Sequence, residues 1–101
     1  MIVGLSEQAQ ADVARIGAWW RENRPDAPSL FADELEAVIA LLEVAPDAGK
    51  PCQTPKRRKV RRVLMPKTRQ YAYHFVVRDD VVEIIAIWGT QRGDGPPLHE
   101  R

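Results

Sequence analysis

Disulfides, metal-binding cysteine clusters and long apolar runs are all missing from this chain of 101 residues, in which Cys52 is the single cysteine. A lone cysteine cannot form an internal disulfide, and a structural zinc site needs several ligands at fixed spacing. No apolar run approaches the roughly 20 residues of a membrane-spanning helix, and residues 1–10 lack the pattern of a signal peptide. We therefore expect a protein of the reducing cytoplasm with no membrane segment.

Motifs that hold cofactors are missing as well. The sequence contains no phosphate-binding glycine loop, no metal-binding motif and no Ser-His-Asp arrangement, so we expect neither a cofactor nor a metal ion. At 45% hydrophobic residues the chain is too apolar to be a disordered tail, and it is too short for two independently folded lobes. We expect residues 1–101 to form one domain with an irregular tail from about residue 89.

The charge is divided unevenly along the chain, although the net value is +1. Residues 1–50 hold four basic and nine acidic side chains, whereas residues 51–101 hold eleven basic and five acidic ones. Within residues 56–69, eight of fourteen side chains are Lys or Arg and none is acidic. This polarity favours a polyanionic or acidic partner for the second half. The alternative is a solvated loop and edge strand kept soluble by charge.

Two amphipathic helices are predicted in the first half. Apolar residues recur at spacings of four, three and four between residues 9 and 20 and again between residues 31 and 42, as on one face of a helix. Ser6 stands where an N-cap would accept a hydrogen bond from the first turn. Pro25 and Pro46 follow the two stripes and end the helices, because the residue before a proline disfavours helical geometry. The acidic side chains of the second helix, Glu34 among them, are expected on its solvated side.

Short strands account for the rest of the predicted structure. A loop is expected over residues 47–57, and Asp79-Asp80 form the tight turn of a hairpin. The resulting order β-α-α-β-β-β predicts an α+β fold, in which a two-helix antiparallel hairpin packs on one face of a mainly antiparallel sheet. The segments predicted as strands are residues 2–5, 60–65, 71–78 and 81–88.

Strict alternation along the hairpin divides its side chains between two faces. The second face, which includes His74 and Glu83, is mixed in character and is expected to be partly open to solvent. The face expected beneath the helices carries Tyr71, Tyr73, Phe75, Val77, Val82, Ile84, Ala86 and Trp88.

Four segments of the sequence resemble the RelE/ParE superfamily of bacterial type II toxins, which includes plasmid stabilisation toxins. They are LSEQAQADVARIGAWW, APSLFADELEAVIALLEVAPDAG, VRRVLMPKTRQYAYHFVVRDDVVEIIAIWG and the trailing RGDGPP, and they occur in the order typical of the family. The resemblance implies a toxin that is neutralised by a cognate antitoxin. RelE-type members cleave messenger RNA at the ribosome, whereas ParE-type members inhibit DNA gyrase.

The residues that would carry out RNA cleavage are incomplete in this sequence. Arg61 and Arg62 match a basic pair often found on the second strand of the family, and they could bind phosphate. Ala72 stands where the family commonly has an arginine, and no tyrosine follows Arg92. The ordinary pKa of His74 suits proton transfer, although a histidine packed beside Ile85 as a structural residue is the alternative.

We therefore favour a ParE-type toxin that acts on gyrase by binding. The alternatives are a RelE-type endonuclease, with Arg61, Arg62, His74 and Arg92 as candidate catalytic residues, and a non-toxic relative that only binds an antitoxin. The antitoxin is expected to be acidic and partly disordered alone. Trp19 is a candidate contact for it. The residues expected to bind the target are Lys56, Arg57, Arg58, Lys59, Arg61, Arg62 and Arg92.

Overall fold

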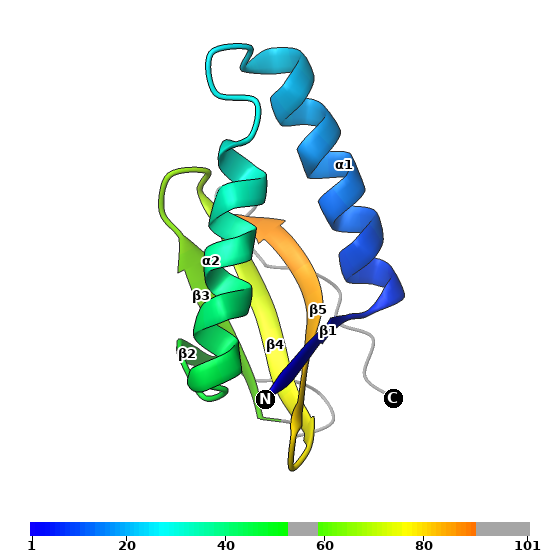
Figure 1. The fold of residues 1–101 in the computed structure, drawn as a ribbon, viewed down its shortest axis with the longest axis vertical. Helices are drawn as coiled ribbons and strands as arrows, with labels where there is room; N and C mark the ends of the chain where they lie inside the picture. The colour runs from blue at the N-terminus through cyan, green and yellow to red at the C-terminus, as the bar shows by residue number, and fades with distance from the viewer. Residues whose placement is uncertain (53–58, 91–101) are drawn as a thin grey trace.

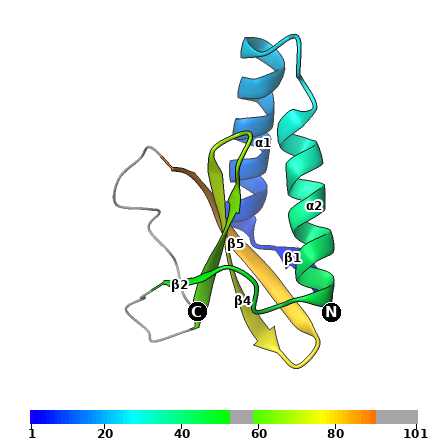
Figure 2. The same ribbon diagram turned by 90° about the vertical axis from the view of Figure 1, so that its left-hand side faces the viewer.

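A computed structural model describes residues 1–52 and 59–90 of the chain, and Figure 1 shows its elements. The sheet has the strand order β1-β5-β4-β3-β2, in which only β1 pairs in parallel. Both helices lie on the same side of this sheet, as Figure 2 shows, which confirms the predicted α+β architecture. The elements are β1 (Ile2–Leu5), α1 (Glu7–Asn23), α2 (Leu30–Val44), β2 (Lys50–Cys52), β3 (Val60–Met65), β4 (Gln70–Arg78) and β5 (Val81–Gly89).

β2 is a correction to the loop predicted over residues 47–57. Lys50–Cys52 pairs with β3 as a short edge strand, a position that tolerates Pro51 because one side of an edge strand needs no donor. Gly49 leads into the strand with φ of 92°, and a Cβ there would lie 2.2 Å from the carbonyl oxygen of Arg62. The chain can approach β3 this closely only because residue 49 is a glycine.

The helix boundaries follow the predicted signals. Ser6 caps α1, since its hydroxyl accepts from the backbone N–H of Ala9 at 3.1 Å and donates to the carbonyl of Ile85 at 3.1 Å. The helix ends at Asn23, two residues before Pro25, and α2 ends at Val44, before Pro46. Neither helix is long and apolar enough to cross a membrane.

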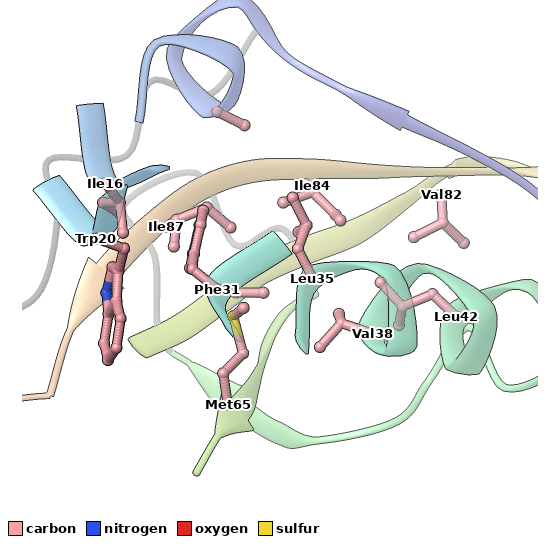
Figure 3. Close-up of a cluster of buried hydrophobic side chains, with 12 residues drawn as sticks. Ile16, Trp20, Phe31, Leu35, Val38, Leu42, Met65, Val82, Ile84 and Ile87 are labelled. Atoms are coloured by element: carbon pink, nitrogen blue, oxygen red, sulfur yellow. The ribbon is translucent and has the colours of Figure 1, made fainter. Parts of the chain in front are cut away.

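The main core lies between the helix pair and the sheet, as Figure 3 shows. The predicted stripes supply its helical side: all four stripe residues of α2 are buried, whereas on α1 Val13 is only partly buried and Asp12, which is outside the stripe, is buried. The strands supply the other side through residues of β3, β4 and β5. The large side chains of this core are Ile16, Trp20, Phe31, Leu35, Val38, Leu42, Met65, Val82, Ile84 and Ile87.

The predicted division of the hairpin between two faces is confirmed for Val82 and Ile84, which lie beneath the helices, but is wrong for most of the other residues. Tyr73 pairs with Ala86 and Arg78 with Val81, as strict alternation requires, but Phe75 pairs with Glu83 because the register shifts twice between these points. Ile85 has no partner in the β4–β5 ladder, so the alternation of β5 changes phase there.

The structure therefore has a second buried cluster on the face of the sheet that the helices do not cover. It contains Val60, Tyr73, Ile85 and Ala86, which are 0–6% exposed. Tyr71, Phe75 and Trp88 pack against it rather than beneath the helices, and Ala72 and Ile87 take the helix side instead.

Two carboxylates attach the helices to the sheet. Glu34 of α2 accepts hydrogen bonds from the backbone N–H groups of Lys67 and Thr68 at 3.0 and 2.7 Å, and from the Thr68 hydroxyl at 2.7 Å. Glu34 is therefore not a solvated surface residue. Asp12 of α1, which is 8% exposed, accepts from the backbone N–H of Ile87 at 3.0 Å and pairs with Arg15. Each carboxylate satisfies backbone donors that neither helix nor sheet would otherwise satisfy.

Adjacent leucines on α2 test the position of the core. Leu42 is fully buried, whereas Leu41 is 39% exposed. We expect Leu42→Ala to lower the free energy of unfolding by about 2–5 kcal/mol, because it leaves a cavity. The matched variant Leu41→Ala should change it by less than about 1 kcal/mol. Urea denaturation measures both, and equal effects of the two substitutions would contradict the packing in Figure 3.

The carboxylate of Glu34 makes stability depend on pH. Partial burial alone would raise its pKa, but the hydrogen bonds from Lys67 and Thr68 and the charge of Lys67 lower it below the usual value near 4.5. The stability that it contributes is present above about pH 4.5 and is lost as the pH falls through the lower pKa of the folded state.

Glu34→Gln should lower the free energy of unfolding at pH 7 by roughly 2 kcal/mol, since it removes charge-assisted hydrogen bonds. It should also flatten the loss of stability in acid. Glu36→Gln, at an exposed position of the same helix, is the control. Thermal melts of the three proteins at several values below pH 5 measure the slopes, and parallel pH profiles would count against the role of Glu34.

Candidate functional site

The basic residues of the second half are distributed over both faces of the sheet. Lys59 is exposed beside β3, and Arg61 and Arg62 are half-buried within it. Arg61 pairs with His74 and shares the helix side, whereas Arg62 pairs with Tyr73 and projects from the opposite face. The two guanidinium groups therefore cannot form one phosphate clamp. The predicted target-binding residues Lys56, Arg57, Arg58 and Arg92 lie outside the described residues.

Arg61 lies at the edge of a small pocket of about 500 Å³ between the end of α2 and β4. Its Nη1 donates to the carbonyl of Gly49 at 3.0 Å, so the side chain also holds the loop between α2 and β2. Lys59 lines the same pocket, and within residues 1–52 and 59–90 Asp47 is the only carboxylate that lines it. This arrangement can attract an anion, but one of the donors of Arg61 already has a structural partner.

His74 is fully buried and is not on an open face, which corrects the prediction. Its Nε2 lies 3.0 Å from the carbonyl oxygen of Ala48, and since a carbonyl only accepts, Nε2 carries the proton. Burial lowers the pKa of His74 below its usual value, and the charge of Arg61 lowers it further, although the hydrogen bond to Ala48 opposes both. The ring is therefore a neutral structural residue that joins β4 to the loop after α2.

Arg62 occupies a more preorganised position than Arg61. Its guanidinium lies over the ring of Tyr71, with Cζ 4.2 Å from the ring centroid. A hydrogen bond with the Tyr73 side chain raises the pKa of Arg62 above its usual value. Lys50 is its neighbour across the β2–β3 ladder, so two positive charges stand together on this face. A cation held in this way loses little side-chain entropy when it binds a carboxylate or phosphate.

Two other positions differ from the sequence-based expectation. Ala72 is fully buried in the core beneath the helices, so a cation at this position would not reach the face on which Arg62 lies. Glu83 pairs with Phe75 on the helix-free side and therefore does not share a face with His74. Burial raises the pKa of the Cys52 thiol, which keeps it protonated and unreactive.

Trp19, the predicted antitoxin contact, is 50% exposed near the end of α1. Its ring packs edge-on against Trp20 at 5.6 Å between centroids. The two rings stand at a larger pocket, of about 770 Å³, which the sequence did not indicate because its other side comes from the β3–β4 turn and the end of β5.

The described part of the chain offers anion-binding groups rather than an acid–base pair. Its single imidazole is buried and hydrogen-bonded, and no three His, Cys, Asp or Glu side chains within residues 1–52 and 59–90 converge to hold a metal ion. Arg62, Lys59 and Arg61 are available for binding acidic or phosphorylated surfaces.

In the part of the chain that the structure describes, a two-helix hairpin packs on a five-stranded sheet with basic surfaces, the fold that the resemblance to the RelE/ParE superfamily implies. A family model described as the ParE toxin of the type II toxin–antitoxin system parDE matches residues 3–93. The chain belongs to this family, and it is accordingly a toxin of the type II class.

A solved structure supports the same fold. The chain is similar to one from the chromosomal ParDE toxin–antitoxin system of P. aeruginosa, with a TM-score of 0.70 and 20% sequence identity. The alignment covers 90% of this chain and 97% of that one. No curated protein matches the sequence.

Buried His74 should make the folded state sensitive to mild acid. Because folding lowers the pKa of His74, the unfolded chain takes up a proton below about pH 6.5 that the folded chain does not. The free energy of unfolding therefore decreases as the pH is lowered. The slope is steepest between the lowered pKa of the folded chain and the ordinary pKa of the unfolded chain, and one group contributes at most about 1.4 kcal/mol per pH unit. His74→Gln, which keeps a donor for the carbonyl of Ala48, should remove this slope. Denaturation between about pH 7 and 5.5 measures it, and an unchanged slope would show that other groups titrate.

Proposed function

We propose that this toxin inhibits DNA gyrase by binding and that a cognate antitoxin neutralises it. The family match over residues 3–93 supports the ParE side of the superfamily. The observation that carries the proposal beyond the family is the complete burial of His74, the histidine that was the candidate general base.

General base catalysis requires a side chain within hydrogen-bond reach of the proton that it removes. His74 lies under the sheet surface, donates from Nε2 to Ala48 and has a lowered pKa. The ring lies in the wall of the pocket that Lys59 and Arg61 also line, but its exposed fraction is zero and its Nε2 proton is already bonded to Ala48. Binding without chemistry is therefore the activity that the described residues support best.

The basic face around Arg62 is the part of the structure best suited to contact the target. Gyrase works on DNA, and a positive surface favours contact with phosphates or acidic side chains of such a target. Arg62 and Lys50 supply two cations there, and the stack of Arg62 on Tyr71 fixes the direction of its donors. Arg61 serves mainly to hold Gly49, so it contributes less to the target.

Arg62→Ala should weaken inhibition of gyrase supercoiling by roughly tenfold or more, because it removes a preorganised charged contact. Arg78→Ala, at an exposed arginine beside the hairpin turn, is the matched control and should inhibit like the parent. Supercoiling assays with purified gyrase and growth of cells expressing each variant measure the effect. Circular dichroism establishes that both variants are folded.

The same cells distinguish the alternative activities. Expression of the parent should leave messenger RNA intact, and His74→Gln should remain toxic. Cleavage of ribosome-bound transcripts that stops in His74→Gln would establish the endonuclease instead. Normal growth with active gyrase and intact transcripts would leave only an antitoxin-binding module.

A further inference from the structure

The pocket of about 770 Å³ lies at the end of the molecule where α1 finishes. One wall is the second half of α1, and the other is formed by the β3–β4 turn and the last residues of β5. Its volume falls in the range of ligand-binding pockets and exceeds what a single side chain fills. The turn that forms one wall is held by Glu34 through the backbone of Lys67 and Thr68, so that wall is positioned before any partner binds.

All three tryptophans of the chain line this pocket. Trp20 belongs to the core, but Trp19 is half exposed and Trp88 is half-buried. A half-exposed tryptophan next to a hollow is poorly explained by folding, since burying it would stabilise the chain. Tryptophan and arginine are the residues most enriched at the energetic centres of protein interfaces.

Basic side chains surround these rings. Among the described residues, the basic side chains that line the pocket are Arg15, Arg24, Lys67 and Arg69, and Glu22 supplies the single carboxylate. Arg15 is paired with Asp12, but among the described residues no carboxylate lies within 4 Å of the charged ends of Arg24, Lys67 or Arg69. Arg15 and Arg24 come from the acidic half of the chain, and Lys67 and Arg69 come from the basic segment 56–69, so the fold gathers cations from both halves at this rim.

We infer that this pocket is the anchor site for an acidic protein segment, which places one large apolar side chain against Trp19 and carboxylates against Arg24 and Arg69. The inference rests on the proposed function, in which the partner is an antitoxin. The partner is inferred from charge complementarity. Apolar rings within a positive rim are complementary to a peptide segment in which glutamate or aspartate flanks leucine or phenylalanine.

Single-stranded nucleic acid fits the pocket less well. Stacking of bases requires open ring faces. Arg24 already lies over the face of Trp20, with Cζ 5.5 Å from the ring centroid, and Trp19 meets Trp20 edge-on at an interplanar angle of 71°. The rings therefore form an apolar wall for a side chain rather than a stacked platform for consecutive bases.

Tryptophan fluorescence of the full chain reports on this site directly, because every tryptophan lines it. The probes are a repeating Glu-Glu-Leu-Phe peptide, its Lys-Lys-Leu-Phe counterpart and a single-stranded oligonucleotide. The acidic peptide should bind and change the emission, and raised salt should weaken it several-fold through screening. Trp19→Ala should weaken it about 30-fold and Arg24→Glu about tenfold.

Two matched variants control for changes elsewhere. Arg21→Glu places the same charge reversal on the last turn of α1 outside the pocket, and Val44→Ala removes an apolar side chain that is 83% exposed at the end of α2. Both should bind the acidic peptide like the parent. Three results would overturn the inference. The oligonucleotide or the basic peptide could bind more tightly than the acidic peptide, or the protein could self-associate through the pocket. Trp19→Ala and Val44→Ala could also bind the acidic peptide with equal affinity.

The supercoiling assay separates this inference from the proposed function. Trp19→Ala and Arg24→Glu should still inhibit gyrase while escaping neutralisation by the antitoxin gene product expressed with them. If the parent binds the acidic peptide but leaves gyrase supercoiling normal, the result would contradict only the proposal that the toxin inhibits gyrase. Gyrase inhibition with neutralisation unchanged in both variants would contradict only the anchor site.

Discussion

The structure depends on the ability of β5 to present apolar side chains to both faces of the sheet. β5 lies between β1 and β4, and the change of phase at Ile85 directs Ile84 and Ile87 toward the helices. Ile85 and Ala86 then pack on the opposite side with Tyr73. A regular strand would place Ile87 away from the helix side and remove a fully buried side chain from the main core. Both clusters therefore depend on one irregular pairing between β4 and β5.

Polar contacts fix the helices over this irregular sheet in a single position. Hydrophobic packing is not directional, so it leaves the helix pair free to slide. Asp12 bonds to the backbone of β5, and Glu34 bonds to the turn between β3 and β4, in which Arg69 has a φ of 61°. These contacts determine where the basic side chains of that turn stand relative to α1, and thus determine the shape of the pocket between them.

The basic residues serve two separate regions because β3 is a strand. Neighbouring residues of a strand point to opposite faces, so Arg61 reaches the loop at Gly49 while Arg62 lies on Tyr71. The pocket at the end of α1 is a third positive region, formed by side chains distant in sequence. A toxin that contacts its target with one region can be bound by an antitoxin at another, which makes neutralisation separable from toxicity by mutation.

The sequence itself determined the order of the elements other than β2, the helix stripes, the Ser6 cap and the turn at Asp79-Asp80. These features follow from local periodicity, capping and turn chemistry. The faces of the hairpin were not determined in this way, because a register shift is set by how β4 and β5 fit beneath the helices. Burial of His74 and the attachment of Glu34 depend on contacts between residues at least 26 positions apart. Such contacts leave no periodic trace in the sequence, so only the tertiary structure decides them.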